Sequence, residues 1–156
     1  MLKMKRIISL FIIVMLAFSM FSCSLNDEAS AKNLVHKTTN LDLADAELTH
    51  TYKDEGWDGS IYHYIFSVKD GFENNLGRGW SSLPLSDEAR GFYESSSILN
   101  GKSVVTIPEI ESGYYYYLND SDASTERVYL VVLDASSDTL YYFAATGQYV
   151  SFPRKY

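Results

Sequence analysis

The fold is decided by residues 127–145, which read RVYLVVLDASSDTLYYFAA. Two runs in this stretch, Arg127 to Leu133 and Thr139 to Ala145, are rich in β-branched and aromatic residues and predict two strands. Polar turn formers join them over 134–138, the length of a five-residue hairpin loop. The first run is apolar on both faces, which is typical of a central strand covered on both sides. The first strand of this hairpin is therefore predicted to be central in the sheet.

Further strands precede and follow this hairpin in the sequence. Ser60 to Val68 is rich in β-branched and aromatic residues, which again predicts a strand. Tyr114 to Leu118 begins with four consecutive tyrosines, and a strand there places two rings on each face of the sheet. Shorter strands are expected over Leu48–Tyr52, Ser103–Ile107 and Gly147–Phe152.

Two short helical segments are expected between the strands. Ser86 is a capping residue for a helix in which Ala89, Phe92 and Tyr93 share one face. One or two helical turns are also expected over 72–76, capped by Asp70. The sequence thus predicts an α+β domain, mainly an antiparallel sheet with one or two short helices packed on it.

The first 23 residues have the features of an export signal. Three basic residues, Lys3, Lys5 and Arg6, precede an apolar run from Ile7 to Phe21. The run is shorter than the ~20 apolar residues that a spanning helix needs. Its length and its positive flank predict a signal peptide over residues 1–22. The chain's single cysteine, Cys23, follows directly.

The segment from Met20 to Cys23 resembles the lipobox of bacterial lipoproteins. Ser22 and Cys23 match that pattern, Met20 stands where leucine is usual, and Phe21 is larger than the usual residue. The resemblance implies a diacylglyceryl group on the Cys23 sulfur and cleavage before Cys23. Two acyl chains suffice for stable anchoring, since each buried CH₂ contributes ~0.8 kcal/mol. The expected location is the extracytoplasmic face of the cell membrane.

Three alternatives to a lipid on Cys23 stay open. An ordinary signal peptidase can cut after the small-x-small triplet Ala29-Ser30-Ala31, which releases a soluble protein. The apolar run can also remain as an uncleaved single-pass anchor. Finally, Cys23 can be an incidental thiol.

The remainder of the chain divides into a tether and one domain. Residues 23–45 lack a sustained apolar period and predict a flexible tether, and residues 46–156 predict a single domain. The alternative is that Leu41 and Leu43 pack as an edge of the domain. Residues 1–22 carry three positive charges and no acidic residue, so the formal charge of −7 becomes −10 for the rest. Nucleic acid is therefore not an expected partner, because its binding needs basic patches.

The body also resembles a group of small Gram-positive bacterial proteins with no assigned activity. The resemblance is carried by Trp80 with Leu83-Pro84-Leu85, by the Ile107-Pro108-Glu109 to Tyr116 segment, and by the Leu133 to Tyr142 hairpin. It implies a common fold and carries over no catalytic residue.

Motifs that support chemistry are sparse. His36, His50 and His63 are scattered and lack ligand spacing, so no metal site or cofactor is expected. Asp120 to Ser124 alternates oxygen ligands like a calcium loop but lacks its glycine and its glutamate, and a solvated loop is the favoured interpretation. Asp54, Glu55 and Asp58 around Trp57 suggest a carbohydrate- or cation-binding rim, although a buried tryptophan closing a turn is commoner.

The sequence favours a non-enzymatic lipoprotein of the cell envelope, a binding or interaction module without an expected catalytic residue. Two alternatives are an exported hydrolase using carboxylate and tyrosine chemistry, and an inhibitor or immunity-type protein that binds another secreted protein. Two carboxylates that converge in a cleft with a raised pKa would favour the hydrolase.

Overall fold

The computed structural model describes residues 27–99, 102–103, 108–110, 112–122, 124–147 and 149–150. The expected signal peptide and Cys23 lie outside these residues. So do residues 104–107 and residues 148, 151 and 152 of two expected strands. Tyr149 and Val150 of the second expected strand are described but lie outside any strand. The chain divides into two compact units between Leu34 and Val35.

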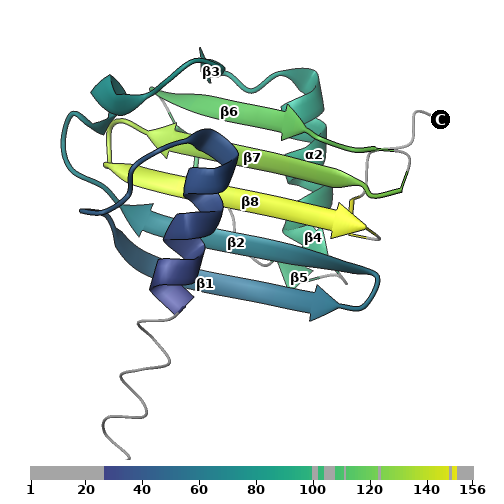
Figure 1. Cartoon of the computed structure of the whole chain (residues 1–156). Coiled ribbons are helices and arrows are strands. Elements are labelled where there is room, and N and C mark those ends of the chain that lie inside the picture. Colours follow the sequence, from purple (N-terminus) through teal and green to yellow (C-terminus); the bar gives the residue numbers. More distant parts are fainter. Residues whose placement is uncertain are drawn as a thin grey trace, which may run out of the picture. The chain divides into compact units, whose positions relative to one another are not determined.

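The second unit is built on a six-stranded sheet in which every neighbouring pair is antiparallel (Figure 1). Across the sheet the strand order is β1-β2-β8-β7-β6-β3. The strands are β1 (Glu47–Gly56), β2 (Gly59–Ser67), β3 (Trp80–Ser82), β6 (Gly113–Asn119), β7 (Arg127–Asp134) and β8 (Thr139–Gly147). A small second sheet pairs β4 (Ile98–Leu99) with β5 (Lys102–Ser103). The predicted α+β class, mainly an antiparallel sheet with short helices, is confirmed.

Strand β7 is central in the sheet, as its two-faced apolar pattern predicted, and its hairpin partner β8 lies beside it between β7 and β2. Residues 130–134 are all buried, and so are residues 140–145 of the partner strand. The hairpin loop is one residue shorter than expected, because Asp134 already pairs with Thr139. Asp138 takes a positive φ of 50° in the turn, which aspartate tolerates better than most residues.

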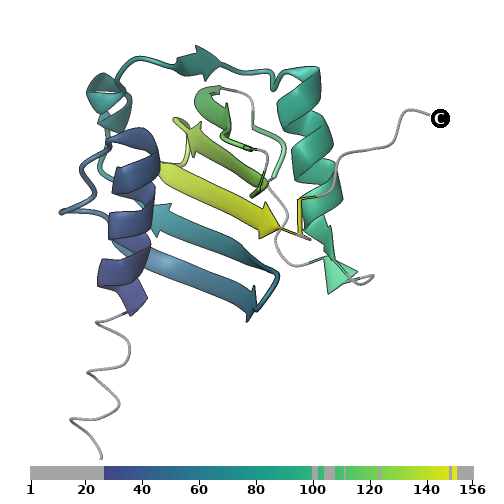
Figure 2. The same cartoon turned by 45° about the vertical axis from the view of Figure 1, so that its right-hand side comes forward.

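Helix α2 (Asp87–Ser97) lies against one face of the sheet (Figure 2). Ala89 and Phe92 are fully buried and belong to one core cluster with Leu130 and Phe143, which confirms the predicted helix face. The predicted cap is also present, since the Ala89 N–H donates to Ser86 Oγ at 3.2 Å. The expected turns near residue 72 form the 3₁₀ helix η1 (Phe72–Asn75), but its capping residue is Gly71 rather than Asp70.

The favoured prediction of a flexible tether is wrong for residues 35–45, and the alternative, in which Leu41 and Leu43 pack with the domain, agrees with their burial. Residues 27–39 are helical, and Val35, Leu41 and Leu43 are at most 3% exposed. Thr38 Oγ1 lies 3.2 Å from the hydroxyl of buried Tyr142 on β8. The segment is ordered because its apolar side chains are buried. Their irregular spacing hid this from a search for apolar periodicity.

Candidate functional site

A cleft of about 700 Å³, the Trp57 cleft, lies at the end of the sheet where the β1–β2 hairpin turns. Its residues come from three segments that are far apart in the sequence: the hairpin turn, the loop before β7, and the end of β8. The lining residues are Gly56, Trp57, Asp58, Gly59, Ser60, Asp122, Ser124, Thr125, Glu126, Thr146 and Gly147.

The first wall of the cleft is the tip of the β1–β2 hairpin. Gly56 pairs with Gly59, so Trp57 and Asp58 alone form the connection. A two-residue turn leaves its central side chains without a neighbouring strand, and Trp57 is 98% exposed. Trp57 is thus exposed, as the sugar-binding interpretation requires. It is not the buried tryptophan that the alternative interpretation placed in this turn.

The opposite wall is the acidic loop that precedes β7. Asp122 Oδ1 accepts hydrogen bonds from the Ser124 N–H at 2.7 Å, the Ser124 hydroxyl at 2.8 Å and the Thr125 N–H at 2.8 Å. The Ser124 hydroxyl, followed by the two backbone groups, lowers the pKa of Asp122. Asp122 therefore organises its own loop.

The end of β8 joins the two walls. The Ser60 N–H donates to Thr146 Oγ1 at 2.9 Å, and the Gly147 N–H donates to the Glu126 carbonyl at 2.9 Å. Gly147 has a φ of +60°, and a Cβ there would lie 2.0 Å from the Asp58 carbonyl oxygen. Only glycine fits this position without moving the hairpin turn.

The acidic rim predicted around Trp57 forms only in part. Asp58 lines the cleft, but Asp54 and Glu55 do not. Successive residues of a strand point to opposite faces, and each of these two carboxylates meets a different tyrosine. The Tyr149 hydroxyl donates to Asp54 at 3.0 Å, and the Tyr62 hydroxyl donates to Glu55 at 2.7 Å.

These tyrosine contacts shift the acidity of the rings. The hydrogen bond to Asp54 raises the pKa of Tyr149. Burial, followed by the hydrogen bond to Glu55, raises the pKa of Tyr62. Both hydroxyls thus stay protonated and keep donating, and the two carboxylates serve to fix the hairpin end beside the cleft.

The groups that line the cleft suit hydroxyl-rich ligands. Asp58, Asp122 and Glu126 supply carboxylate acceptors, and Ser124 and Thr146 supply hydroxyl groups. The indole of Trp57 presents an open apolar face beside them. Among the described residues no group of three or more histidine, cysteine or acidic side chains is placed to hold a metal ion.

The three histidines form no metal-binding group among the described residues, although His50 and His63 lie on the paired strands β1 and β2. His36 Nδ1 lies 2.8 Å from the Leu41 carbonyl, and His50 is exposed on β1. His63 is 1% exposed within β2, and neither of its ring nitrogens has a hydrogen-bond partner among the described residues. Burial, followed by the charge of His50, lowers the pKa of His63 to about 4. Its ring packs edge-on to Phe143, with centroids 4.8 Å apart, and serves as part of the core.

The shifted pKa values among the described carboxyl groups do not have the direction that a general acid requires. The pKa values of Asp122 and Asp134 are both shifted downward. Burial by itself would raise the pKa of Asp134, but hydrogen bonds from Ser136 and Ser137 lower it overall. A general acid needs the opposite direction at neutral pH.

The sequence indicates residues of both walls of the cleft, but it does not predict that the two walls lie side by side. The turn around Trp57 and the loop at Asp120–Ser124 were separate motifs, and Thr146 and Gly147 gave no signal. The insertion of β8 between β2 and β7 brings the three segments together. The glycine pair around Trp57-Asp58 was the one local sign of a tight turn that exposes its tip.

Comparisons with protein-family models, curated proteins and solved structures found no match. Within the described residues, no helix has the length and apolar character needed to cross a membrane.

Proposed function

We propose that this chain is a lipid-anchored, non-enzymatic binding module of the cell envelope that takes carbohydrate in the Trp57 cleft. The anchor rests on the signal-peptide pattern and the lipobox resemblance ending at Cys23. The binding role rests on one observation above all: Trp57 is 98% exposed at the mouth of a carboxylate-lined cleft. Large apolar residues at such exposure are informative because burial normally removes them from water.

The chemistry of a sugar ring matches both halves of the cleft. The C–H groups of a pyranose stack on an indole face, while its hydroxyls donate to carboxylates. The net charge of −10 after residue 22 disfavours phosphate-rich polymers, which leaves neutral or amino-bearing glycans as the ligand class. Covering one indole face removes roughly 100 Å² from water, which contributes about 2.5 kcal/mol at 25 cal/mol/Å².

The carbohydrate proposal is tested by titrating the chain with soluble oligosaccharides. Neutral hexose and N-acetylhexosamine oligomers are titrated by calorimetry, a readout that does not depend on the indole and therefore serves wild type and variants alike. Trp57→Ala should weaken binding by about 50- to 100-fold, the equivalent of the stacking energy. Tyr114→Ala is the matched control, since Tyr114 is the other exposed large aromatic among the described residues and lies on β6. Equal affinity in the two variants, or a cleft that takes only polyamines, would contradict the proposal.

The anchor is tested independently of the ligand. Wild type and Cys23→Ala are compared by intact mass and by detergent partitioning of the exported protein. The lipoprotein proposal expects the mutant to lose the lipid mass and its retention by the membrane. A mature wild-type chain that starts at Lys32 and carries no acyl group would overturn it.

A further inference from the structure

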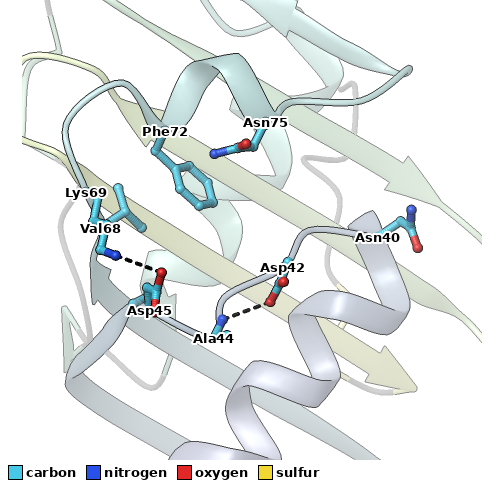
Figure 3. Close-up of a pocket in the computed structure, with 9 residues that line it drawn as sticks. Asn40, Asp42, Ala44, Asp45, Val68, Lys69, Phe72 and Asn75 are labelled. Atoms are coloured by element: carbon cyan, nitrogen blue, oxygen red, sulfur yellow. Dashed lines mark hydrogen bonds and ion pairs between the residues drawn. The ribbon is translucent and has the colours of Figure 1, made fainter.

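A second pocket, of about 400 Å³, lies at the other end of the β1–β2 hairpin (Figure 3). Its residues precede β1 and follow β2, whereas the Trp57 cleft lies where the two strands are connected. The nine residues of β2 at ~3.3 Å each separate the two sites by about 30 Å. The pocket is lined by Asn40, Asp42, Ala44, Asp45, Ala46, Val68, Lys69, Phe72 and Asn75.

Part of the lining of this pocket is apolar and well buried. Ala46, Val68 and Phe72 are each at most 8% exposed. Phe72 begins η1, and its N–H donates to the Lys69 carbonyl at 3.1 Å. Gly71 supports this turn with a φ of 75°, which places the Phe72 ring over the pocket (Figure 3). A small aliphatic group can therefore be buried here without rearrangement of the backbone.

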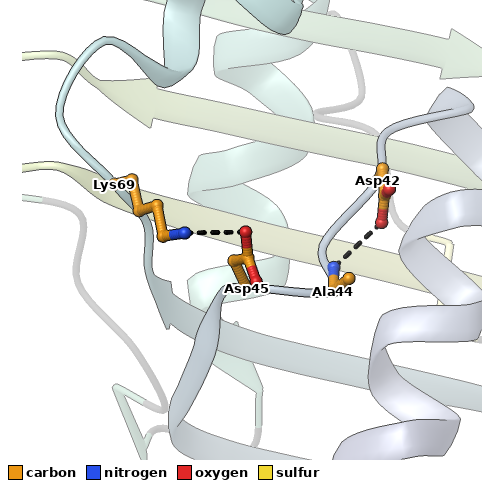
Figure 4. A network of polar contacts seen from close by, with 4 residues as sticks. All are labelled: Asp42, Ala44, Asp45 and Lys69. Atoms are coloured by element: carbon orange, nitrogen blue, oxygen red, sulfur yellow. Dashed lines mark hydrogen bonds and ion pairs between the residues drawn. The ribbon is translucent and has the colours of Figure 1, made fainter.

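The rim carries both signs of charge. Lys69 Nζ lies 2.7 Å from Asp45 Oδ2, and the two side chains are 71% and 73% exposed (Figure 4). The Asp42 carboxylate faces the same space and accepts the Ala44 N–H at 2.9 Å (Figures 3 and 4). Exposed ion pairs contribute little to stability, so the lysine can exchange its partner at low cost.

A ligand of one charge leaves this rim unbalanced. An anion that pairs with Lys69 breaks the ion pair between Lys69 and Asp45. A cation alone competes with Lys69 for the carboxylate of Asp45. A zwitterion that carries an ammonium and a carboxylate on neighbouring atoms replaces both halves of the ion pair at once. The rim holds two carboxylates and one ammonium, so the ligand's ammonium has a choice of two partners.

We infer that this pocket binds a free α-amino acid with an aliphatic side chain. The ligand carboxylate pairs with Lys69, its ammonium pairs with Asp42 or Asp45, and its side chain rests on Phe72 and Val68. The amides of Asn40 and Asn75 stand on the rim as further donors and acceptors. The inference does not depend on carbohydrate binding, because the two sites share no residue.

The test is calorimetric titration of the purified full-length chain with L-leucine and two analogues that each lack one charge. L-Leucine amide has no carboxylate, and 4-methylpentanoate has no ammonium. Leucine should bind at least about tenfold more tightly than either, the typical loss for one charge-assisted hydrogen bond. Lys69→Gln should remove this advantage over the amide, whereas Lys53→Gln, a surface lysine on β1, should preserve it.

Three results would overturn the inference. Leucine and leucine amide could bind equally well to wild type, Lys53→Gln could match Lys69→Gln, or none of the three compounds could bind. Glycine supplies the test of the apolar lining, because it keeps both charges and should bind more weakly than leucine. Trp57→Ala should leave leucine binding unchanged, which separates this result from the fate of the carbohydrate proposal.

Discussion

Replacement of His63 by phenylalanine should make the protein more resistant to acid. His63 is buried between the rings of Tyr52 and Phe143, and its two nitrogens lack hydrogen-bond partners in the described chain. Its pKa falls from 6.5 to about 4 on folding, chiefly through burial. The imidazole therefore takes up a proton near pH 6.5 in the unfolded chain, but only near pH 4 in the folded chain. The stability of the wild type must fall as the pH falls through that window.

The size of this effect follows from the two pKa values. A difference of one pKa unit corresponds to 1.36 kcal/mol, so the loss between pH 7 and pH 4 is about 3 kcal/mol. The phenylalanine variant lacks this titration and keeps the aromatic contacts. It also removes two buried polar atoms without partners, and such atoms cost about 1–3 kcal/mol each. At pH 7 the free energy of unfolding of the variant should equal or exceed that of the wild type. At pH 4 this difference in favour of the variant should be about 3 kcal/mol larger than at pH 7.

The assay is urea denaturation of both proteins at pH 7, 6, 5 and 4. The difference in unfolding free energy between them cancels the contributions of all other titrating groups. Gly77→Ala is the control, because Gly77 has no neighbour within 4 Å of a new Cβ and the change alters no ionisable group. A difference that stays constant from pH 7 to pH 4 would refute the argument. His63→Leu repeats the test if the phenylalanine ring is too large for the site.

Three further changes have defined outcomes. Gly147→Ala should destabilise the protein by at least about 2 kcal/mol in thermal or urea unfolding, because Gly147 has a φ of +60° and a Cβ there would lie 2.0 Å from the Asp58 carbonyl oxygen. The control Gly77→Ala should keep a free energy of unfolding within about 0.5 kcal/mol of wild type. Asp134→Ala should lower the free energy of unfolding by about 2 kcal/mol at pH 7, since it removes the acceptor of the Ser136 and Ser137 hydroxyls. Because the pKa of Asp134 is lowered in the folded state, this loss should shrink as the pH drops below about 4. A loss that does not change with pH would contradict the view that the ionised carboxylate holds the two serines. A double-mutant cycle of Thr38→Val and Tyr142→Phe should give a coupling energy of about 1 kcal/mol, and a value near zero would mean that residues 35–39 do not pack on β8 in solution.

The strand pattern could be predicted from sequence because it depends on local alternation. The apolar run from Val128 to Leu133 required a covered central strand, and Ser86 with Ala89 and Phe92 required a capped helix that faces the sheet. The order of the strands could not be predicted in the same way. No local pattern indicates that β8 pairs with β2 as well as β7, and both sites depend on which segments the sheet brings together.

The tether prediction failed for a different physical reason. Polar composition indicates a solvated segment only if no apolar residue in it is buried. Val35, Leu41 and Leu43 follow no regular apolar period, so the packing of Leu41 and Leu43 stayed the second interpretation. Their burial depends on the sheet face that receives them, where Tyr142 meets Thr38. The second pocket was missed with them, because Asn40, Asp42 and Asp45 were interpreted as tether residues.

The exposure of Trp57 by itself is a consequence of the turn. Any residue between Gly56 and Gly59 stands at the tip of a two-residue connection and stays in contact with water. What requires explanation is the type of residue, because a polar side chain would fit there at no cost in exposed apolar surface. The neighbouring acids do not explain it, since Asp54 and Glu55 are held by Tyr149 and Tyr62. A ligand that covers the indole does explain it, and for that reason the stacking experiment on Trp57 decides more about this protein than any change in its core.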